Sequence, residues 1–579
     1  MQVRTMLAFT VTAIVGAAVA ACGGSSTAPS TAGSSATGAA PSTASTGDRE
    51  ALMLKHRGGT MRLLAKAAGG TLDPQVNYTL QYWQMYRSVY DGLLAFKAAG
   101  GDAAFTVVPD LAEEIPEPTN GGKTWTFTIR KGIKFSNGKE VTPADVVASF
   151  QRIFKVKSPT SGGFYGGIVG ADKCLKTPAT CTLEGGVSAD EAAGTVTINL
   201  TAPDPEFTYK IAVPHASIVP AESPPEDAGT TPLPGTGAYT FKSYDPNKQL
   251  LLVRNPEFKE WSADAQPDGF PDEIHYDFGL TVEAQITAIQ NGEADWTLEQ
   301  PPADRLNELG TKFADQVKLN ELTAYWYAPM NVNLPPFDKL EARQAVNFAI
   351  DRAAAIQLFG GPNLATPTCQ ILPPGFPGHE DYCPYTKDPG ATWSAPDLDR
   401  AKQLVDQSGT AGQSVAIVVS DDEVNKAMGI YLQSVLNSIG YKATVKPISG
   451  NIQFTYIQNT NNKVQISVSQ WYQDYPAASD FLYVLYGCAS FTPGSDSSIN
   501  IPGFCDKEID DRMKAALALA ITDPDAANLE WAKIDRAVVD KAPSAPLFTP
   551  KHVDFISKRV GNFVFSKQFY WIVDQSWVQ

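Results

Sequence analysis

The order strand, helix, strand occurs twice in this chain and restricts the fold more than any other pattern in it. Residues 415–419 are apolar and mostly β-branched, and residues 421–439 have helical spacing that ends at Gly440. A second strand pattern follows at residues 443–448, and residues 274–298 repeat the order in shorter form. A helix that connects two strands of one sheet brings them together in parallel. The sequence therefore predicts an α/β fold with two such regions.

A block that precedes these regions is richer in strand patterns. Trp125, Phe127 and Ile129 alternate with threonines, which is the pattern of a half-buried strand. Thr142 then stands before Pro143 at the start of a helical pattern. Threonine is a good N-cap and proline suits the first helical position. We therefore expect a strand, a tight turn and a capped helix in this order.

Two further elements are predicted from periodicity. Residues 340–359 have amphipathic helical spacing and stop at Gly360, so we expect one helix there. Residues 464–469 are expected to form one strand that ends at Gln470.

The first 57 residues are expected to lie outside the folded part. Residues 6–21 are uncharged and mostly apolar, a run too short for a comfortable membrane span and typical of a secretory leader. The run ends in Ala20-Ala21-Cys22, which fits a lipobox whose cysteine thiol takes a diacylglycerol. We predict a lipoprotein signal peptide over residues 1–22 and a disordered tether of Gly, Ser, Thr and Ala over residues 23–57. The alternative is cleavage before an ordinary cysteine without lipid.

Size and charge exclude several classes of function. A chain of 579 residues exceeds one typical core, so two or three domains are expected. The net charge of −16 repels nucleic-acid phosphates and anionic lipid surfaces, and no Lys/Arg-rich run opposes it. After the leader, no apolar stretch approaches the roughly 18 residues of a membrane span. We expect no nucleic-acid partner, and membrane attachment only through the lipid.

The cysteines predict a disulfide framework. Six remain after Cys22, and an even number in an exported chain favours disulfides. We predict bonds within the near pairs, because each pair brackets a loop rich in Gly, Pro and Thr, although some could be free buried thiols. The pairs are Cys174 with Cys181, Cys369 with Cys383, and Cys488 with Cys505.

Motifs of catalysis and cofactor binding are not found in the sequence. Residues 121–124 look like the end of a phosphate-binding loop, but Glu117 stands where the first glycine is needed. No GxSxG or HExxH motif occurs, and the five histidines are scattered. We predict that the chain is not an enzyme and holds no metal or cofactor.

Six segments stand in a fixed order along the chain. The longest is PDLAEEIPEPTNGGKTWTFTIRKGIKFSNGKEVTPADVVASFQRI at 109–153. The others are LDP at 72–74, YDGLL at 90–94, PGTGAYTF at 234–241, NVNLPPFDKLEARQAVNFAIDR at 331–352 and QWYQDYPAASDFL at 470–482. Together they span nearly the whole chain after the leader. In these segments and their order the chain resembles the family 5 extracellular solute-binding proteins of ABC importers, the group of oligopeptide-, dipeptide- and nickel-binding proteins.

The resemblance implies a two-lobed α/β clamp of the periplasmic-binding-protein kind (type II, large class), with an extra mixed α+β domain on lobe one. By resemblance, lobe one comprises residues 58–100, 232–324 and 541–579. The extra domain comprises residues 101–231, and lobe two comprises residues 325–540.

The resemblance also implies a ligand contact. Trp471 and Asp474 match a W-x-x-D motif whose aspartate pairs with the α-ammonium of a peptide in oligopeptide-binding members. The expected strand at 464–469 supports this place, because ligands of open α/β sheets bind beyond the carboxyl ends of strands. The alternatives are that Asp474 caps the following turn or helix and that Trp471 belongs to the core. Further predicted contacts, each also compatible with a core position, are Tyr472, Tyr475, Trp83, Phe164, Tyr165 and Trp326.

These features predict an extracytoplasmic, lipid-anchored binding protein on the outer face of the cell membrane, periplasmic or at the cell surface. We expect a monomer that captures a solute, most simply a peptide, and delivers it to an ABC permease powered by a separate ATPase. Departures after Asp474, including the Cys488–Cys505 insertion, leave two alternatives open. One is a non-peptide solute such as an oligosaccharide, and the other is a ligand-sensing receptor without transport.

Overall fold

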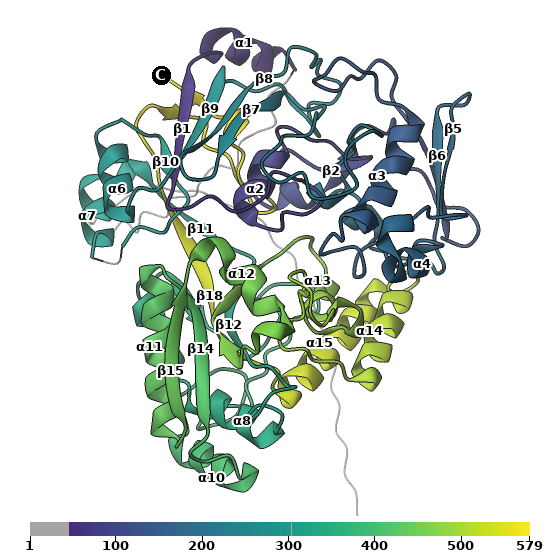
Figure 1. Ribbon diagram of the computed structural model, residues 1–579. Coiled ribbons are helices and arrows are strands. Elements are labelled where there is room, and N and C mark those ends of the chain that lie inside the picture. The colour runs from purple at the N-terminus through teal and green to yellow at the C-terminus, as the bar shows by residue number, and fades with distance from the viewer. Residues whose placement is uncertain (1–45, 303) are drawn as a thin grey trace, which may run out of the picture. The chain divides into compact units, whose positions relative to one another are not determined.

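The computed structural model describes residues 46–302 and 304–579, which Figure 1 draws in colour. The predicted leader, Cys22 and most of the predicted tether lie outside these residues. Helix α1 (Thr46–His56) overlaps the end of the predicted tether, so the prediction of disorder is wrong for these residues. Arg49 pairs with Glu260 at 2.6 Å, and the ring of His56 stacks on Trp577 with centroids 4.1 Å apart. These contacts hold the helix on the folded part.

The first sheet has the strand order β10-β1-β9-β8-β7. Helix α6 (Val282–Gln290) connects β9 to β10, and both of these strands run parallel to β1, which lies between them. The parallel direction predicted for the two strands of residues 274–298 is therefore confirmed, but each strand pairs with β1 and not with the other. The strands are β1 (Thr60–Ala65), β7 (Tyr239–Asp245), β8 (Gln249–Arg254), β9 (Glu273–Phe278) and β10 (Trp296–Thr297).

The second predicted α/β region is also confirmed. Strand β14 (Ser414–Ser420) leads through α11 (Glu423–Ser438) to β15 (Lys442–Ile448), and the two strands pair in parallel along their whole length. The short strand β16 (Ile466–Ser467) lies parallel to β14 on its other side. Figure 1 shows α11 beside the long β14–β15 pair.

The helix predicted over residues 340–359 is two helices, so that prediction is wrong in its length. Helix α8 (Leu340–Ala349) ends before Ile350, and α9 (Arg352–Phe359) begins after Asp351. The Asp351 carboxylate accepts a hydrogen bond of 3.1 Å from the backbone N–H of Ala354. The aspartate thus caps a new helix, a role that competes with continuing the old one.

A third sheet has the order β11-β18-β12-β17, with β13 also paired to β18. The first half of the long strand β18 pairs with β12 and β13, and its second half pairs with β11. The register of the β12–β18 ladder shifts between Trp326 and Tyr327. The strands are β11 (Val317–Glu321), β12 (Ala324–Pro329), β13 (Ala365–Pro367), β17 (Ser469–Tyr472) and β18 (Ser544–Phe555).

The prediction of one strand over residues 464–469 is wrong, because the chain changes sheets there. β16 pairs with β14, whereas β17 begins at Ser469 and pairs antiparallel with β12. Residues 466–469 are all buried, so their pattern does not reveal the crossing. Trp471 consequently lies inside a strand rather than beyond one.

The segment 101–231 contains an antiparallel sheet of order β4-β6-β5 and helix α3 (Pro143–Lys155). Trp125, Phe127 and Ile129 are buried, as their alternation predicts. The Thr142 side chain accepts from the backbone N–H of Asp145, and the Asp145 carboxylate accepts from that of Thr142, which confirms the predicted cap as a capping box. The strands are β4 (Thr124–Thr128), β5 (Val187–Asp190) and β6 (Thr195–Asn199).

The three disulfides join the predicted near pairs, Cys174–Cys181, Cys369–Cys383 and Cys488–Cys505. None of the helices in the described residues is long and apolar enough to cross a membrane. The remaining elements are α2 (Leu80–Tyr86), β2 (Leu94–Phe96), β3 (Val107–Pro109), α4 (Ala171–Lys176), α5 (Phe207–Lys210), α7 (Leu306–Lys312), α10 (Leu398–Ser408), α12 (Gly450–Gln458), α13 (Ala478–Tyr486), α14 (Lys507–Leu519), α15 (Pro524–Lys541), β19 (Val560–Gly561), β20 (Phe565–Ser566), β21 (Tyr570–Trp571) and β22 (Trp577–Val578).

Candidate functional site

Asp474 lies two residues beyond β17, where several parts of the chain meet. Its side chain is only 5% exposed. The hydroxyl of Tyr78, which comes from the segment before α2, donates a hydrogen bond to Asp474 Oδ2. The Gln568 side chain donates to the Asp474 carbonyl oxygen. A buried carboxylate is thus held between segments almost 400 positions apart in the sequence.

A second carboxyl lies beside the first. Asp480, in the first turn of α13, is fully buried, and its Oδ2 accepts the backbone N–H of Asp474 at 2.9 Å. Burial raises the pKa of Asp474 to about 7, although hydrogen bonds from Tyr78 and Asp480 lower it. Burial and the neighbouring charge of Asp474 raise the pKa of Asp480 well above its ordinary value. Asp474 does not cap α13, because the N-cap of that helix is Ala477.

Aromatic rings surround the Tyr78–Asp474 contact. The ring of Trp471 meets Tyr78 edge-on at a centroid distance of 5.5 Å. The ring of Trp83 stacks on Tyr78 at a centroid distance of 5.3 Å, and its Nε1 donates to the Asn77 carbonyl at 3.0 Å. The structure therefore brings the predicted residues Trp471, Trp83 and Asp474 together through Tyr78.

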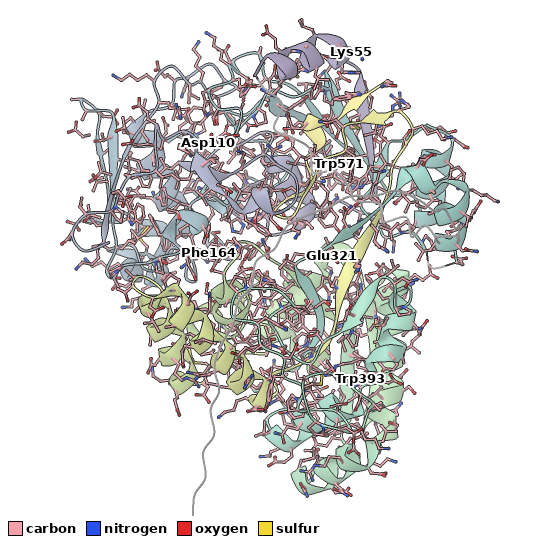
Figure 2. All side chains as sticks on the ribbon, turned by 180° about the vertical axis from the view of Figure 1, so that it is seen from behind. Lys55, Asp110, Phe164, Glu321, Trp393 and Trp571 are labelled. Carbon is pink, nitrogen blue, oxygen red and sulfur yellow. A yellow bond between two sulfur atoms is a disulfide. The ribbon has the colours of Figure 1, made fainter. Side chains whose placement is uncertain are left out.

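Tyr475 lies among a second group of rings. Its ring meets Phe164 edge-on at 5.4 Å and stacks on Tyr209 at 6.1 Å. Phe164 lies where the segment 101–231 meets the later helices, as its label in Figure 2 shows. Tyr165 is fully buried behind Phe164, and its hydroxyl donates to the Lys210 carbonyl at 2.9 Å. Tyr165 thus supports the group from the core of that segment.

The glycine-rich loop around Phe164 approaches the Cys488–Cys505 insertion. A Cβ atom added to Gly162 would lie 3.1 Å from the Ala489 carbonyl oxygen, and one added to Gly163 would lie 3.4 Å from Ser490 Oγ. The backbones can come this close because these positions carry no side chain. The insertion and the loop therefore shape the same edge of the site.

An ion-pair group borders the rings. The Lys210 ammonium lies 2.7 Å from Asp204 Oδ2 and 3.5 Å from Glu206 Oε2. Ser479 of α13 donates to Glu206 Oε2 at 2.5 Å. The charge of Lys210 is therefore already matched by two acidic partners of its own segment.

Two predicted residues lie away from this cluster. Trp326 is part of a separate core, where its ring stacks on Phe548 at 5.4 Å and meets Phe359 at 5.4 Å. Tyr472 faces the opposite side of β17 from Trp471, since successive strand residues alternate. The structure does not bring either one to Asp474.

Several contacts of the cluster have no sequence prediction, among them Tyr78, Asp480 and Glu206. Asp480 stands in the QWYQDYPAASDFL segment, six residues after Asp474, at the start of a helix. That spacing around Pro476 is the signal that could have pointed to it. Tyr78 and Glu206 have no local signal, because only the tertiary fold brings them near.

The cluster differs from the small cavity of about 30 Å³ beside Arg87, Asp91 and Asp110, which none of its residues line. No group of three or more His, Cys, Asp or Glu among residues 46–302 and 304–579 has the arrangement of a metal site. Chemically, the cluster offers a buried carboxylate, hydroxyl groups and aromatic faces. This set suits a ligand with a cationic donor group and a variable remainder.

Comparisons with known proteins agree with this description. The chain is 25% identical over 521 residues to the probable D,D-dipeptide-binding periplasmic protein DdpA of Escherichia coli (strain K12), covering 87% of this chain and 92% of DdpA. Among solved structures, it matches clavulanic acid biosynthesis oligopeptide binding protein 2 with a TM-score of 0.76 and 25% identity, over 90% of this chain and 96% of the other. It also matches the PBP AgaA in complex with agropinic acid, from A. tumefacien R10, with a TM-score of 0.74 and 21% identity, over 90% and 99% of the two chains.

The predicted two-lobed periplasmic-binding-protein fold is confirmed by these structures. The model of the bacterial extracellular solute-binding proteins, family 5 (middle region), matches residues 106–493, about two thirds of the chain. The chain therefore belongs to the bacterial extracellular solute-binding proteins of family 5.

Proposed function

We propose that this protein captures a peptide at Asp474 outside the cytoplasm and presents it to an ABC permease whose ATPase is a separate chain. A lipid on Cys22 holds it at the outer face of the membrane, and residues 23–45 act as the tether. Residues 58–100, 232–324 and 541–579 form lobe one, residues 101–231 the extra domain, and residues 325–540 lobe two. The protein works as a monomer.

The observation that supports this proposal most is the buried Asp474 carboxylate, which among the described residues has a hydroxyl donor but no cation beside it. An isolated buried carboxylate is costly unless a cation or hydrogen bonds compensate it. The α-ammonium of a peptide supplies the missing charge through charge-assisted hydrogen bonds. Trp471, Tyr475 and Phe164 supply apolar contact area that tolerates different side chains.

The names of two relatives support a peptide ligand, because one is a probable D,D-dipeptide-binding protein and the other an oligopeptide-binding protein. A second candidate is a non-peptide solute, because a relative of the same fold is described in complex with agropinic acid. The loop between Cys488 and Cys505 lies beside Gly162 at the edge of the site. Because this loop changes the shape of that edge, it favours the non-peptide solute as a second candidate.

Native mass spectrometry of the purified protein, followed by identification of any co-purified solute, tests the proposal directly. In a second step, trialanine and N-acetyl-trialanine are added. Trialanine should bind and the acetylated peptide should not, because acetylation removes the ammonium. The variant Asp474→Asn should lose at least about tenfold in affinity.

The matched control is Asp525→Asn, which changes an exposed aspartate at the start of α15. Its affinity should equal that of the unchanged protein. Equal binding of the acetylated peptide, or full affinity in Asp474→Asn, would reject the peptide anchor and favour the non-peptide candidate.

A further inference from the structure

In the part of the chain that the structure describes, the two neighbouring carboxyls of the site have no cation to balance them. Asp474 is 5% exposed and Asp480 is fully buried. Within residues 46–302 and 304–579, the buried ammonium near them is that of Lys210, which is paired with Asp204 and Glu206. Two ionised carboxylates in such surroundings would repel each other and lack solvation. The ionisable groups that face the pair are Tyr78, Tyr165, Tyr475 and Glu206, none of them cationic.

His215 does not supply the missing charge either. Its ring packs on Tyr78 at a centroid distance of 4.8 Å. Burial lowers its pKa to about 3, so the imidazole is neutral at neutral pH. Its Nε2 lies 3.0 Å from the Asn77 carbonyl oxygen and its Nδ1 lies 2.8 Å from the Thr160 hydroxyl, which suits a neutral ring with the proton on Nε2.

The hydrogen bonds of Asp480 are unequal. Oδ2 accepts the backbone N–H of Asp474. Oδ1 is buried and has no hydrogen-bond partner among the described residues. An ionised oxygen in that position would be an orphaned acceptor. A proton on Oδ1 would make it a donor instead, and the carboxyl that interacts with the Asp480 side chain is that of Asp474.

We propose that Asp480 is a positioning residue that remains protonated at neutral pH and donates a hydrogen bond to the Asp474 carboxylate. Asp474 then accepts from two neutral donors, the Tyr78 hydroxyl and the Asp480 hydroxyl, which fix its orientation. The pair carries a single negative charge, which one ligand ammonium neutralises. The ligand part of this proposal rests on the proposed function, whereas the protonation of Asp480 does not.

Protonation is tested without ligand, by the melting temperatures of the unchanged protein and of Asp480→Asn between pH 5 and 9. Folding raises the pKa of the Asp480 carboxyl above the ordinary aspartate value of 3.8. Its protonation therefore stabilises the fold, and this stabilisation is lost as the pH rises from 3.8 through the pKa of the folded state. The asparagine does not titrate. The melting temperature of Asp480→Asn should therefore rise relative to that of the unchanged protein as the pH increases. A difference that stays constant over this range would overturn the proposal, and Asp525→Asn serves as the constant control.

Positioning is tested by trialanine binding at pH 7. Asp480→Ala should weaken binding about tenfold, because it removes the donor and leaves the Asp474 backbone N–H without its acceptor. Asp480→Asn should restore affinity to within about threefold of the unchanged protein, because its amide donates and accepts as the protonated acid does. An asparagine variant as weak as the alanine variant would show that Asp480 acts as an anion and would overturn the proposal.

The two proposals fail in different ways. If the unchanged protein binds no peptide, or if Asp474→Asn binds as well as the unchanged protein, the proposed function fails. The pH dependence of stability still decides whether Asp480 is protonated.

Discussion

Ser479, at the start of α13, donates a 2.5 Å hydrogen bond to Glu206, which lies just before α5 in the segment 101–231. Both residues are buried, so water cannot replace the bond. Ser479→Ala should therefore lower the free energy of unfolding by about 1.5–3 kcal/mol, the range for hydrogen bonds to charged groups. Urea titration measures the change. The control Ser243→Ala removes an exposed hydroxyl in β7, and an equal loss there would contradict the prediction.

Ligand affinity should fall as the pH is lowered through about 7. Burial raises the pKa of Asp474 to about 7, so at lower pH its carboxyl is protonated and no longer attracts an ammonium. The loss should approach about tenfold per pH unit, because one proton competes with one ligand. Titration calorimetry with trialanine from pH 5 to pH 8 measures it, and an affinity that does not change with pH would refute this role.

The raised pKa of Asp474 has the opposite effect on the stability of the ligand-free protein, which should fall as the pH rises. The ordinary pKa of an aspartate is 3.8, so the stabilising contribution of protonated Asp474 is full below that value. It is lost as the pH rises to about 7. In Asp474→Asn this part of the pH dependence should disappear.

Arg152 of α3 should be essential for stability. Its Nη1 donates to Asp73 Oδ1 at 2.9 Å and to Gln75 Oε1 at 2.8 Å, and all three side chains are buried. Arg152→Met leaves the Asp73 charge buried without its partner, which should cost about 3–5 kcal/mol. Lys139→Met breaks the exposed pair with Glu222 and should cost less than about 1 kcal/mol. Similar losses in both variants by chemical denaturation would show that burial does not decide the effect.

The disulfides should differ in their effect according to the loops that they close. Cys488 and Cys505 are 17 positions apart, whereas Cys174 and Cys181 are 7 apart. Replacing both cysteines of the longer loop by serine should destabilise the protein by about 3 kcal/mol, and the shorter loop should cost less. Denaturant titration of the two double variants compares them, and the reverse order would show that packing, not loop length, dominates.

Cys22→Ser should release the protein from the membrane. Without the thiol no diacylglycerol can be attached, and two acyl chains are what make such an anchor stable. Fractionation of expressing cells should move the protein from the membrane pellet to the soluble extracytoplasmic fraction. A protein that stays in the soluble fraction with Cys22 intact would show that the cysteine carries no lipid.

Local patterns predicted several elements correctly. The capping box at Thr142 and helix α6 depend on neighbouring residues, and the sequence contains all of their determinants. The parallel β14–β15 pair follows from the order of elements alone. Asp474 and Trp471 come from the family resemblance. The structure brings both into contact with Tyr78, and their contact with a ligand stays a prediction.

The predictions that failed share a physical cause. In each of them, the structure of a segment depends on a residue or strand that is distant in the sequence. The chain leaves one sheet for another between β16 and β17 because β14 and β12 receive its two halves. Trp326 belongs to a core because Phe548, over 200 positions later, covers its ring. Tyr78 reaches Asp474 only after both segments have folded. Periodicity describes which face of an element is apolar, and it does not say what that face meets.

Strand β18 gives the molecule a mechanical property. Its twelve residues carry hydrogen bonds to β12 and β13 at one end and to β11 at the other. A rotation of one end of β18 relative to the other must therefore twist a strand that is hydrogen-bonded along both halves. The β12–β18 ladder is irregular at the register shift beside Trp326, so we expect bending of the strand to concentrate there.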